Sequence, residues 1–185
     1  MLAFAVYAGL LPAERAAAQS VSERLQMCGA CHGEDGNSKL ERIPSLAGQP
    51  EFYLLNQLVL IREAVRMVPA MQDAVKGLSD GDIQTIAAHF AKLPAKPSDE
   101  PIDAAQARKG AELASKILCV SCHLPDLSGR EQMPRLARQR LDYLRYSLKA
   151  LRDGQRGGAD PLMVEAILGH SDADIEALAN YAASK

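Results

Sequence analysis

The feature that most constrains this chain is a five-residue motif that occurs twice. Cys28-Gly29-Ala30-Cys31-His32 recurs 91 residues later as Cys119-Val120-Ser121-Cys122-His123. Other segments repeat at nearly the same offset, for example IPSLA at 43–47 with MPRLA at 133–137. Such a constant offset over many positions indicates a tandem duplication of one structural unit.

Two domains joined by a linker are predicted from this duplication. Residues 94–103 contain three prolines and no apolar periodicity, which is typical of an extended linker. We therefore expect one domain over residues 20–93 and another over residues 104–185, called here the first and the second lobe. A lobe of about 80 residues is too small for a generous core unless a staple or a cofactor contributes to it.

Residues 1–19 have the pattern of a signal peptide. The run MLAFAVYAGLL is apolar, but it is shorter than the roughly 20 residues that cross a bilayer. Ala16-Ala17-Ala18 then provides the small residues of a cleavage site. We expect cleavage to leave a mature chain that starts near Gln19, outside the cytosol. The alternative is a short buried N-terminal helix.

Helices are expected throughout both lobes, so the predicted fold class is all-α. Four polar residues stand where N-caps would begin helices, namely Ser20 and Ser79 in the first lobe and Asp103 and Ser171 in the second. The helices after Ser20 and Asp103 run toward the two motifs. Runs of helix-forming residues fill 51–66 and 141–152. The last helix of each lobe has one apolar face, and no useful stretch alternates as a β-strand would.

The repeated C-x-x-C-H motif is the attachment signature of c-type haem. Two thiols one helical turn apart can add to the two vinyl groups at one edge of the porphyrin, and the following histidine can bind the iron. We expect two haem c groups, attached at Cys28, Cys31, Cys119 and Cys122 and ligated by His32 and His123. A large ring in each lobe would also compensate for the scarcity of aromatic residues, which make up 4% of the chain.

Three other uses of paired cysteines fit this sequence less well. Disulfides are common in exported proteins, but they do not explain a histidine after each pair. A zinc site built from two C-x-x-C pairs normally has about 15–20 residues between them, whereas 87 residues separate Cys31 from Cys119. A thioredoxin-type pair expects a βαβ unit, which is absent from the predicted elements.

Methionine is the expected ligand on the other side of each iron. Met71 lies eight residues before Ser79, and Met163 lies eight residues before Ser171, so the two methionines occupy equivalent positions. Thioether sulfur favours ferrous iron and raises the reduction potential. Because His/Met ligation fills both axial positions, the expected chemistry is outer-sphere electron transfer.

Two other residues remain open as axial ligands. Met67 is one helical turn from Met71 but has no counterpart in the second lobe. His170 replaces a leucine of the first lobe and could compete with Met163, although a histidine in such a loop is more often packed or solvated. Met27 and Met133 are expected in the core.

Further residues are expected around the haem groups. Pro44 and Pro134 can each place a backbone carbonyl against a ligand histidine. The candidates for binding haem propionates are Tyr53, Gln57 and Arg66 in the first lobe and Tyr143 and Arg156 in the second. Ser147 stands where Gln57 would recur, so the two networks cannot be identical.

The charge balance excludes some partners and suggests one. A net charge of −2 does not fit a nucleic-acid-binding protein with a strongly basic surface. The second lobe nevertheless contains a basic cluster, Arg135, Arg138, Arg140, Arg145, Lys149, Arg152 and Arg156. This basic cluster is either a solvated helix face or a docking patch for an acidic redox partner.

Several segments of the sequence resemble the dihaem cytochrome c4 family. CGACHGEDGNS, IPSLAGQPEFYL and LSDGDIQTIAAHF, with Met71 and weaker copies in the second half, carry a likeness that covers nearly the whole mature chain. The resemblance implies two class I cytochrome c domains related by pseudo-twofold symmetry, with haem propionates facing each other. The second lobe departs from the pattern in HLPDLSG, which replaces HGEDGNS, and in ARQ, which replaces AGQ.

The resemblance also implies a role as a periplasmic electron carrier rather than an enzyme. Its expected partners are redox proteins, either a dehydrogenase or another upstream donor, and a terminal oxidase or another acceptor. Peripheral association with the membrane is a further expectation. Two alternatives stay open, a dedicated cytochrome subunit of a dehydrogenase complex and a haem enzyme with one open iron.

Overall fold

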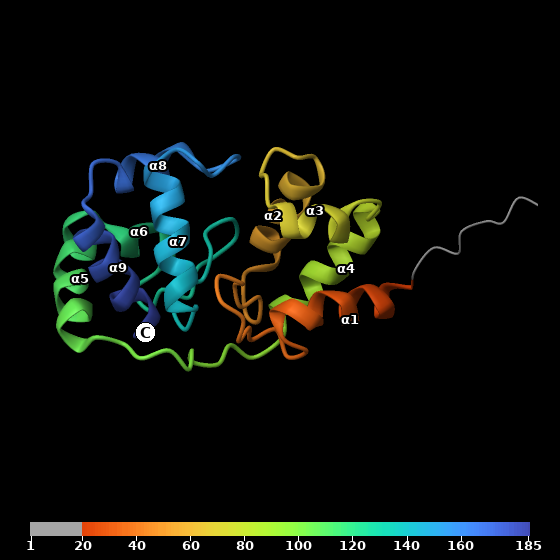
Figure 1. The fold of residues 1–185 in the computed structure, drawn as a ribbon, viewed down its shortest axis with the longest axis horizontal. Coiled ribbons are helices and arrows are strands. Elements are labelled where there is room, and N and C mark those ends of the chain that lie inside the picture. The colour runs from red at the N-terminus through yellow and green to blue at the C-terminus, as the bar shows by residue number, and fades with distance from the viewer. Residues whose placement is uncertain (1–19) are drawn as a thin grey trace, which may run out of the picture.

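A computed structural model describes residues 20–185, and the signal peptide predicted for residues 1–19 lies outside the described residues. The two lobes lie side by side, and the linker runs along one edge of both (Figure 1). Over residues 20–185 the regular elements are helices, with a single isolated bridge between Arg130 and Met133. In this part of the chain no helix has the length and apolarity needed to span a membrane.

The first lobe contains four helices, and the second lobe repeats them, with the equivalent of the first helix divided into two. The helices of the first lobe are α1 (Val21–His32), α2 (Glu51–Arg62), α3 (Pro69–Val75) and α4 (Asp80–Ala91). Those of the second lobe are α5 (Ala104–Lys116), α6 (Cys119–His123), α7 (Leu141–Arg152), α8 (Pro161–Ile167) and α9 (Asp172–Ala183).

The four predicted N-caps are confirmed. Ser20, Ser79 and Ser171 form capping boxes with the acidic residue three positions later, and Asp103 accepts hydrogen bonds from two backbone N–H groups of α5. These side chains satisfy N–H groups that the first turn of a helix leaves free. Local chemistry therefore sets where the first and last helices of each lobe begin.

Two predicted helix ends are wrong, and two short helices were not predicted. The helix expected over 51–66 stops at Arg62, because the chain turns at Ala64 with a φ of 55°. The helix that begins after Asp103, which we expect to run up to the second motif near Cys119, stops at Lys116, and Leu118 with a φ of 58° separates it from the motif helix α6. Helices α3 and α8 begin at prolines and are too short to show a clear periodicity.

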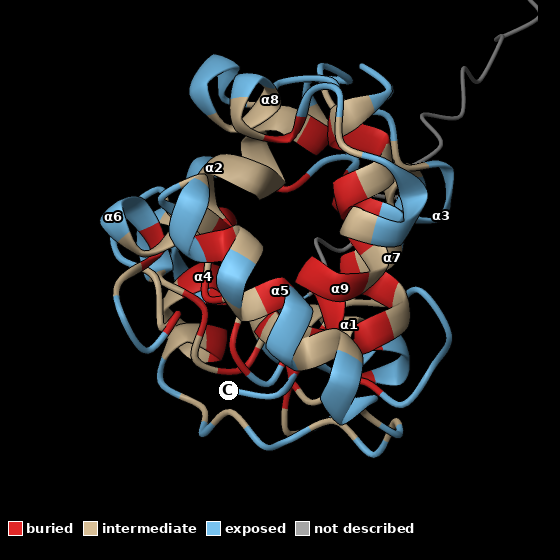
Figure 2. Ribbon diagram, turned by 90° about the vertical axis from the view of Figure 1, so that its left-hand side faces the viewer, coloured by how far each residue is buried: buried red, intermediate tan, exposed pale blue. Residues whose placement is uncertain are grey.

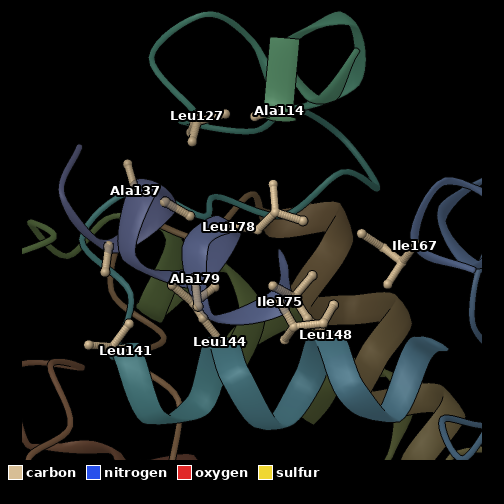
Figure 3. Close-up of a cluster of buried hydrophobic side chains, with 12 residues drawn as sticks. Ala114, Leu127, Ala137, Leu141, Leu144, Leu148, Ile167, Ile175, Leu178 and Ala179 are labelled. Carbon is tan, nitrogen blue, oxygen red and sulfur yellow. The ribbon is translucent and has the colours of Figure 1, made fainter. Parts of the chain in front are cut away.

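Each lobe packs around its own hydrophobic cluster. The cluster of the first lobe contains the apolar face of α4, which includes Ile83, Ile86, Ala87 and Phe90. In the second lobe, Leu144 and Leu148 of α7 point toward Ile175 and Ala179 of α9 (Figure 3). The buried positions follow these facing surfaces, while the outer faces of the helices are exposed (Figure 2).

One compensating exchange explains the divergent loop of the second lobe. In the first lobe, Gly36 has a φ of 73°, and a Cβ there would lie 3.1 Å from the ring of Phe90. The equivalent pair in the second lobe is Leu127 and Ala182, with Leu127 at a φ of 57° and 1% exposed. The volume has moved from the helix to the loop, so the core stays filled.

The crossing of α5 and α9 depends on Gly110. A Cβ at this position would lie 2.0 Å from the carbonyl oxygen of Ala177 and 2.8 Å from Cβ of Tyr181. We predict that Gly110→Ala destabilises the second lobe by about 2 kcal/mol, because the two helices must move apart. Thermal unfolding of the haem-loaded protein, followed by circular dichroism, measures the change.

Gly81→Ala is the matched control for this substitution. Gly81 lies in α4, and its nearest neighbour for an added Cβ is Ser79 Oγ at 3.8 Å. Alanine should therefore leave stability unchanged or raise it by up to about 1 kcal/mol. An equal loss of stability in both variants would contradict the packing argument.

Candidate functional site

The histidine of each motif is buried and held by a proline carbonyl. Nδ1 of His32 lies 2.8 Å from the carbonyl oxygen of Pro44, and Nδ1 of His123 lies 2.8 Å from that of Pro134. A carbonyl oxygen can only accept, so Nδ1 carries the proton and Nε2 keeps its lone pair. Burial lowers the pKa of both histidines, although these hydrogen bonds act in the opposite direction. Each ring is therefore a neutral imidazole with its metal-binding nitrogen free.

Each motif presents one thiol to the interior and one to the surface. Cys28 and Cys119 are half-buried and touch the hydrophobic clusters of their lobes, whereas Cys31 and Cys122 are exposed. Burial raises the pKa of the Cys28 and Cys119 thiols. A group attached to both thiols of a motif would therefore lie between the cluster and the surface.

The two short helices bring one methionine to each cluster. Met71 of α3 packs against the same hydrophobic cluster as Cys28, and Met163 of α8 packs against the same cluster as Cys119. In both lobes the structure thus brings together the motif and the methionine that the duplication pairs with it. The ligand set itself remains a prediction at this point.

The other methionines and His170 have different surroundings. The side chain of Met67 is 64% exposed. Met27 is 39% exposed, so its predicted place in the core is wrong; it lies on the outer face of α1. Nδ1 of His170 lies 3.9 Å from Asp174, one turn into α9, and the backbone carbonyl of His170 accepts a hydrogen bond from Arg152.

The residues predicted to bind propionates form one cluster between the lobes. Arg66 donates to Tyr143 of the second lobe, and Arg156 donates to Tyr53 of the first lobe at 3.1 Å. Gln57 accepts from both arginines. The contact is reciprocal, because each arginine reaches the tyrosine of the opposite lobe. Within the second lobe Ser147 accepts from Arg156, as Gln57 accepts from Arg66 within the first lobe.

Three arginines of the interface suit the anionic propionates of haem. Arg66, Arg135 and Arg156 form no ion pair with a carboxylate of residues 20–185. Burial lowers the pKa of Arg135 to about 10, and its Nε is buried without a hydrogen-bond partner among the described residues. A buried cation without a counter-ion is costly, so Arg135, with the half-buried Arg66 and Arg156 beside the interface, fits a ligand that brings carboxylates.

Sequence reasoning missed two glutamines of the interface. Gln49 of the first lobe and Gln139 of the second are 4% and 2% exposed, and each binds the backbone of the opposite lobe. Both stand at the end of repeated segments, AGQ and ARQ, 90 residues apart. A polar residue kept in both copies of a duplication is the signal that could have found them.

The seven residues of the basic cluster do not form one continuous exposed patch. Arg135 and Arg140 are buried, and Arg156 lies between the lobes. The remaining members except Arg138 have acidic partners, namely Arg145 with Glu176, Lys149 with Asp172, and Arg152 with Asp153 and Asp172. Six of the seven residues are therefore buried or bonded within the protein, which does not favour a docking patch made of the whole cluster.

Comparison with known proteins decides what this arrangement is. No family model matches the chain. Cytochrome c4 of Pseudomonas aeruginosa is 36% identical over 165 residues, which span 84% of this chain and 82% of the relative. The chain belongs to the cytochrome c4 family. The crystal structure of reduced cytochrome c4 from Pseudomonas stutzeri superposes with a TM-score of 0.79 at 33% identity, covering 89% of this chain and 97% of that one.

Membership of the cytochrome c4 family establishes the cofactors and the general role. The protein is a dihaem c-type cytochrome with two tandem class I domains, and it transfers electrons. A related protein of Thiomonas intermedia is named thiosulfate dehydrogenase electron acceptor; it is 33% identical over 199 residues, covering 100% of this chain and 90% of the relative. Cytochromes related to this chain therefore work with redox proteins.

The most buried ion pairs of the basic cluster connect the second lobe to the linker. The side chain of Arg140 is 8% exposed, and it lies 3.0 Å from Asp142 and 3.6 Å from Glu100. We predict that Arg140→Met costs about 3 kcal/mol, because two nearby carboxylates lose their partner. Denaturant unfolding of the haem-loaded protein measures the loss.

Arg145→Met serves as the control. Arg145 pairs with Glu176, but both side chains are more than one-third exposed. Solvent screens this pair, so its loss should cost about 1 kcal/mol or less. A similar loss of unfolding free energy in the two variants would show that burial does not make the ion pairs of Arg140 more stabilising than an exposed pair.

Proposed function

We propose that two His/Met iron centres, one in each lobe, let this protein carry electrons between redox proteins of the periplasm. The observation that carries this proposal is the same in both lobes. The histidine of each motif is buried with its Nδ1 proton fixed, and a methionine from a short helix packs against the same hydrophobic cluster as the first cysteine of that motif. Residues His32 and Met71 would hold the first iron, and His123 and Met163 the second.

When bound, the haem iron supplies a one-electron redox couple, and His/Met ligation favours its ferrous state. The chain would attach each haem through the thiols of one motif, Cys28 with Cys31 and Cys119 with Cys122. The interface arginines Arg66, Arg135 and Arg156 would neutralise propionates between the lobes. If His32 with Met71 and His123 with Met163 hold the two irons, the protein would offer no open coordination site for a substrate, which supports a carrier rather than an enzyme.

The axial ligands are tested by substitution. We predict that Met71→Ala and Met163→Ala each abolish half of the methionine–iron charge-transfer absorption and convert one haem to a high-spin or water-ligated form. Optical and electron paramagnetic resonance spectra of the ferric protein measure both changes. Loss of a thioether ligand should also lower the reduction potential of that haem.

Met67→Ala is the matched control, because Met67 is one turn from Met71 but exposed. Its spectrum should equal that of the unaltered protein. A spectrum unchanged in Met71→Ala and altered in Met67→Ala would reassign the first ligand. The same comparison for Met163 uses His170→Ala.

A second proposal concerns the electron donor. Because similar proteins are named as electron acceptors of thiosulfate dehydrogenase, we propose that a dehydrogenase of a sulfur compound reduces this cytochrome. We expect purified thiosulfate dehydrogenase with thiosulfate to reduce both haems, and thiosulfate alone to leave them oxidised. Absence of reduction would leave the carrier role intact and remove this donor.

Size-exclusion chromatography of the native material separates a free carrier from a dedicated subunit. We expect the mature chain to elute on its own rather than with a catalytic partner. A terminal oxidase as acceptor and peripheral association with the membrane remain predictions.

A further inference from the structure

The proline carbonyl that holds His32 belongs to a peptide group with a second hydrogen bond. The carbonyl oxygen of the peptide group between Pro44 and Ser45 accepts a hydrogen bond from Nδ1 of His32, at 2.8 Å. The N–H of the same peptide group donates to Oε1 of Gln139, also at 2.8 Å. Gln139 belongs to the second lobe. One peptide group therefore connects the histidine of one lobe to a glutamine of the other.

The second lobe contains the mirror arrangement. The carbonyl oxygen of the peptide group between Pro134 and Arg135 accepts a hydrogen bond from Nδ1 of His123, at 2.8 Å. Its N–H donates to Oε1 of Gln49, from the first lobe, at 3.0 Å. The two connections cross the interface in opposite directions, and they join equivalent positions of the duplication.

Both glutamine side chains are fixed in orientation. Nε2 of Gln139 donates to the carbonyl oxygen of Ser45, and Nε2 of Gln49 donates to that of Arg135, each at 2.9 Å. A backbone N–H can only donate and a carbonyl can only accept, so the amide oxygen and nitrogen of each glutamine have one possible assignment. Both glutamines and Ser45 and Arg135 are buried, which keeps water from replacing these bonds.

We propose that Gln139 and Gln49 are positioning residues that tune the iron ligand of the opposite lobe through these peptide groups. This inference rests on the proposed roles of His32 and His123 as iron ligands. A hydrogen bond at the N–H of a peptide group polarises it and makes its carbonyl oxygen a better acceptor, by about 10–30% per bond. The stronger bond at Nδ1 gives the imidazole more anionic character and makes it a more basic ligand.

The sign of the effect follows from this polarisation. A more basic imidazole stabilises ferric iron relative to ferrous iron, so each glutamine lowers the reduction potential of the haem in the other lobe. Removing Gln139 should therefore raise the potential of the first haem, and removing Gln49 should raise that of the second. Mutation of a residue that hydrogen-bonds a metal-bound histidine typically changes activity or metal affinity about 10–100-fold. Each glutamine acts one peptide group further away from the histidine. We therefore expect its removal to change the equilibrium constant for electron exchange between the haems by a few-fold.

The test uses Gln139→Met and Gln49→Met, which keep the length of the side chain and remove its hydrogen bonds. The first readout is a redox titration of the haem-loaded protein that resolves the two potentials. The second is the Nδ1–H resonance of His32 and His123 in nitrogen-labelled ferrous protein, which is diamagnetic when both haems are low-spin. We expect Gln139→Met to raise the first potential and move the His32 signal upfield. Gln49→Met should do the same for the second haem and His123.

The proposal predicts that each variant changes the potential and the histidine signal of the opposite lobe only, which distinguishes tuning from simple docking of the lobes. If the glutamines only hold the lobes together, both variants will change both potentials and both histidine signals alike, and the proposal is overturned. The control Arg138→Met removes an exposed neighbour of Gln139 whose bond to Ala95 in the linker touches neither peptide group. It should leave both potentials and both signals unchanged.

A conservative variant guards against misfolding. Gln139→Glu keeps an acceptor for the N–H of Ser45, and a protonated glutamate can replace Nε2 as the donor to the carbonyl of Ser45, so this variant should leave the first potential close to that of the unaltered protein. A rise in this variant would also overturn the proposal. Failure of the ligand assignment is separate, since the unaltered protein would then lack two low-spin His/Met spectra.

Discussion

Each lobe depends on one hydrogen bond, from the buried histidine of its motif to a proline carbonyl. This bond fixes the proton on Nδ1 and leaves Nε2 directed away from the backbone as a free donor of electrons to a metal. The motif helix sets the position of the histidine, and the loop at the proline sets the orientation of its ring. The rest of the lobe, from the capped helices to the hydrophobic cluster, keeps these two segments in register.

The haem motifs, the all-α class and the N-caps could be predicted from sequence because each rests on chemistry within a few residues. Ser20, Ser79 and Ser171 cap helices by contacts three positions away. The failures involve contacts between distant segments. Arg140 and Arg135 are indistinguishable from surface arginines in the sequence, but the opposite lobe and the linker bury them. Met27 lies beside a motif, yet the face of α1 that carries it is exposed.

The two lobes, which contain few aromatic residues, fill an equivalent part of their cores with different side chains. Phe90 fills the core of the first lobe, while Leu127 fills the equivalent space in the second from a loop with a left-handed backbone. The two cores are therefore different solutions to one shape. Such solutions are available because the duplicated frame, rather than any single large side chain, determines the volume to be filled around each cofactor.

The reciprocal contacts between the lobes have the form of a closed dimer interface, in which each half offers the same surface to the other. Arg66 with Tyr143 and Arg156 with Tyr53 are one contact made twice. In a dimer of separate chains, any substitution would appear on both sides at once. The linker removes that restriction, so equivalent positions can hold different residues, as Ser45 in the first lobe and Arg135 in the second do. Because both halves lie in one chain, the two sides of this symmetric contact can differ, and one haem site can become chemically distinct from the other.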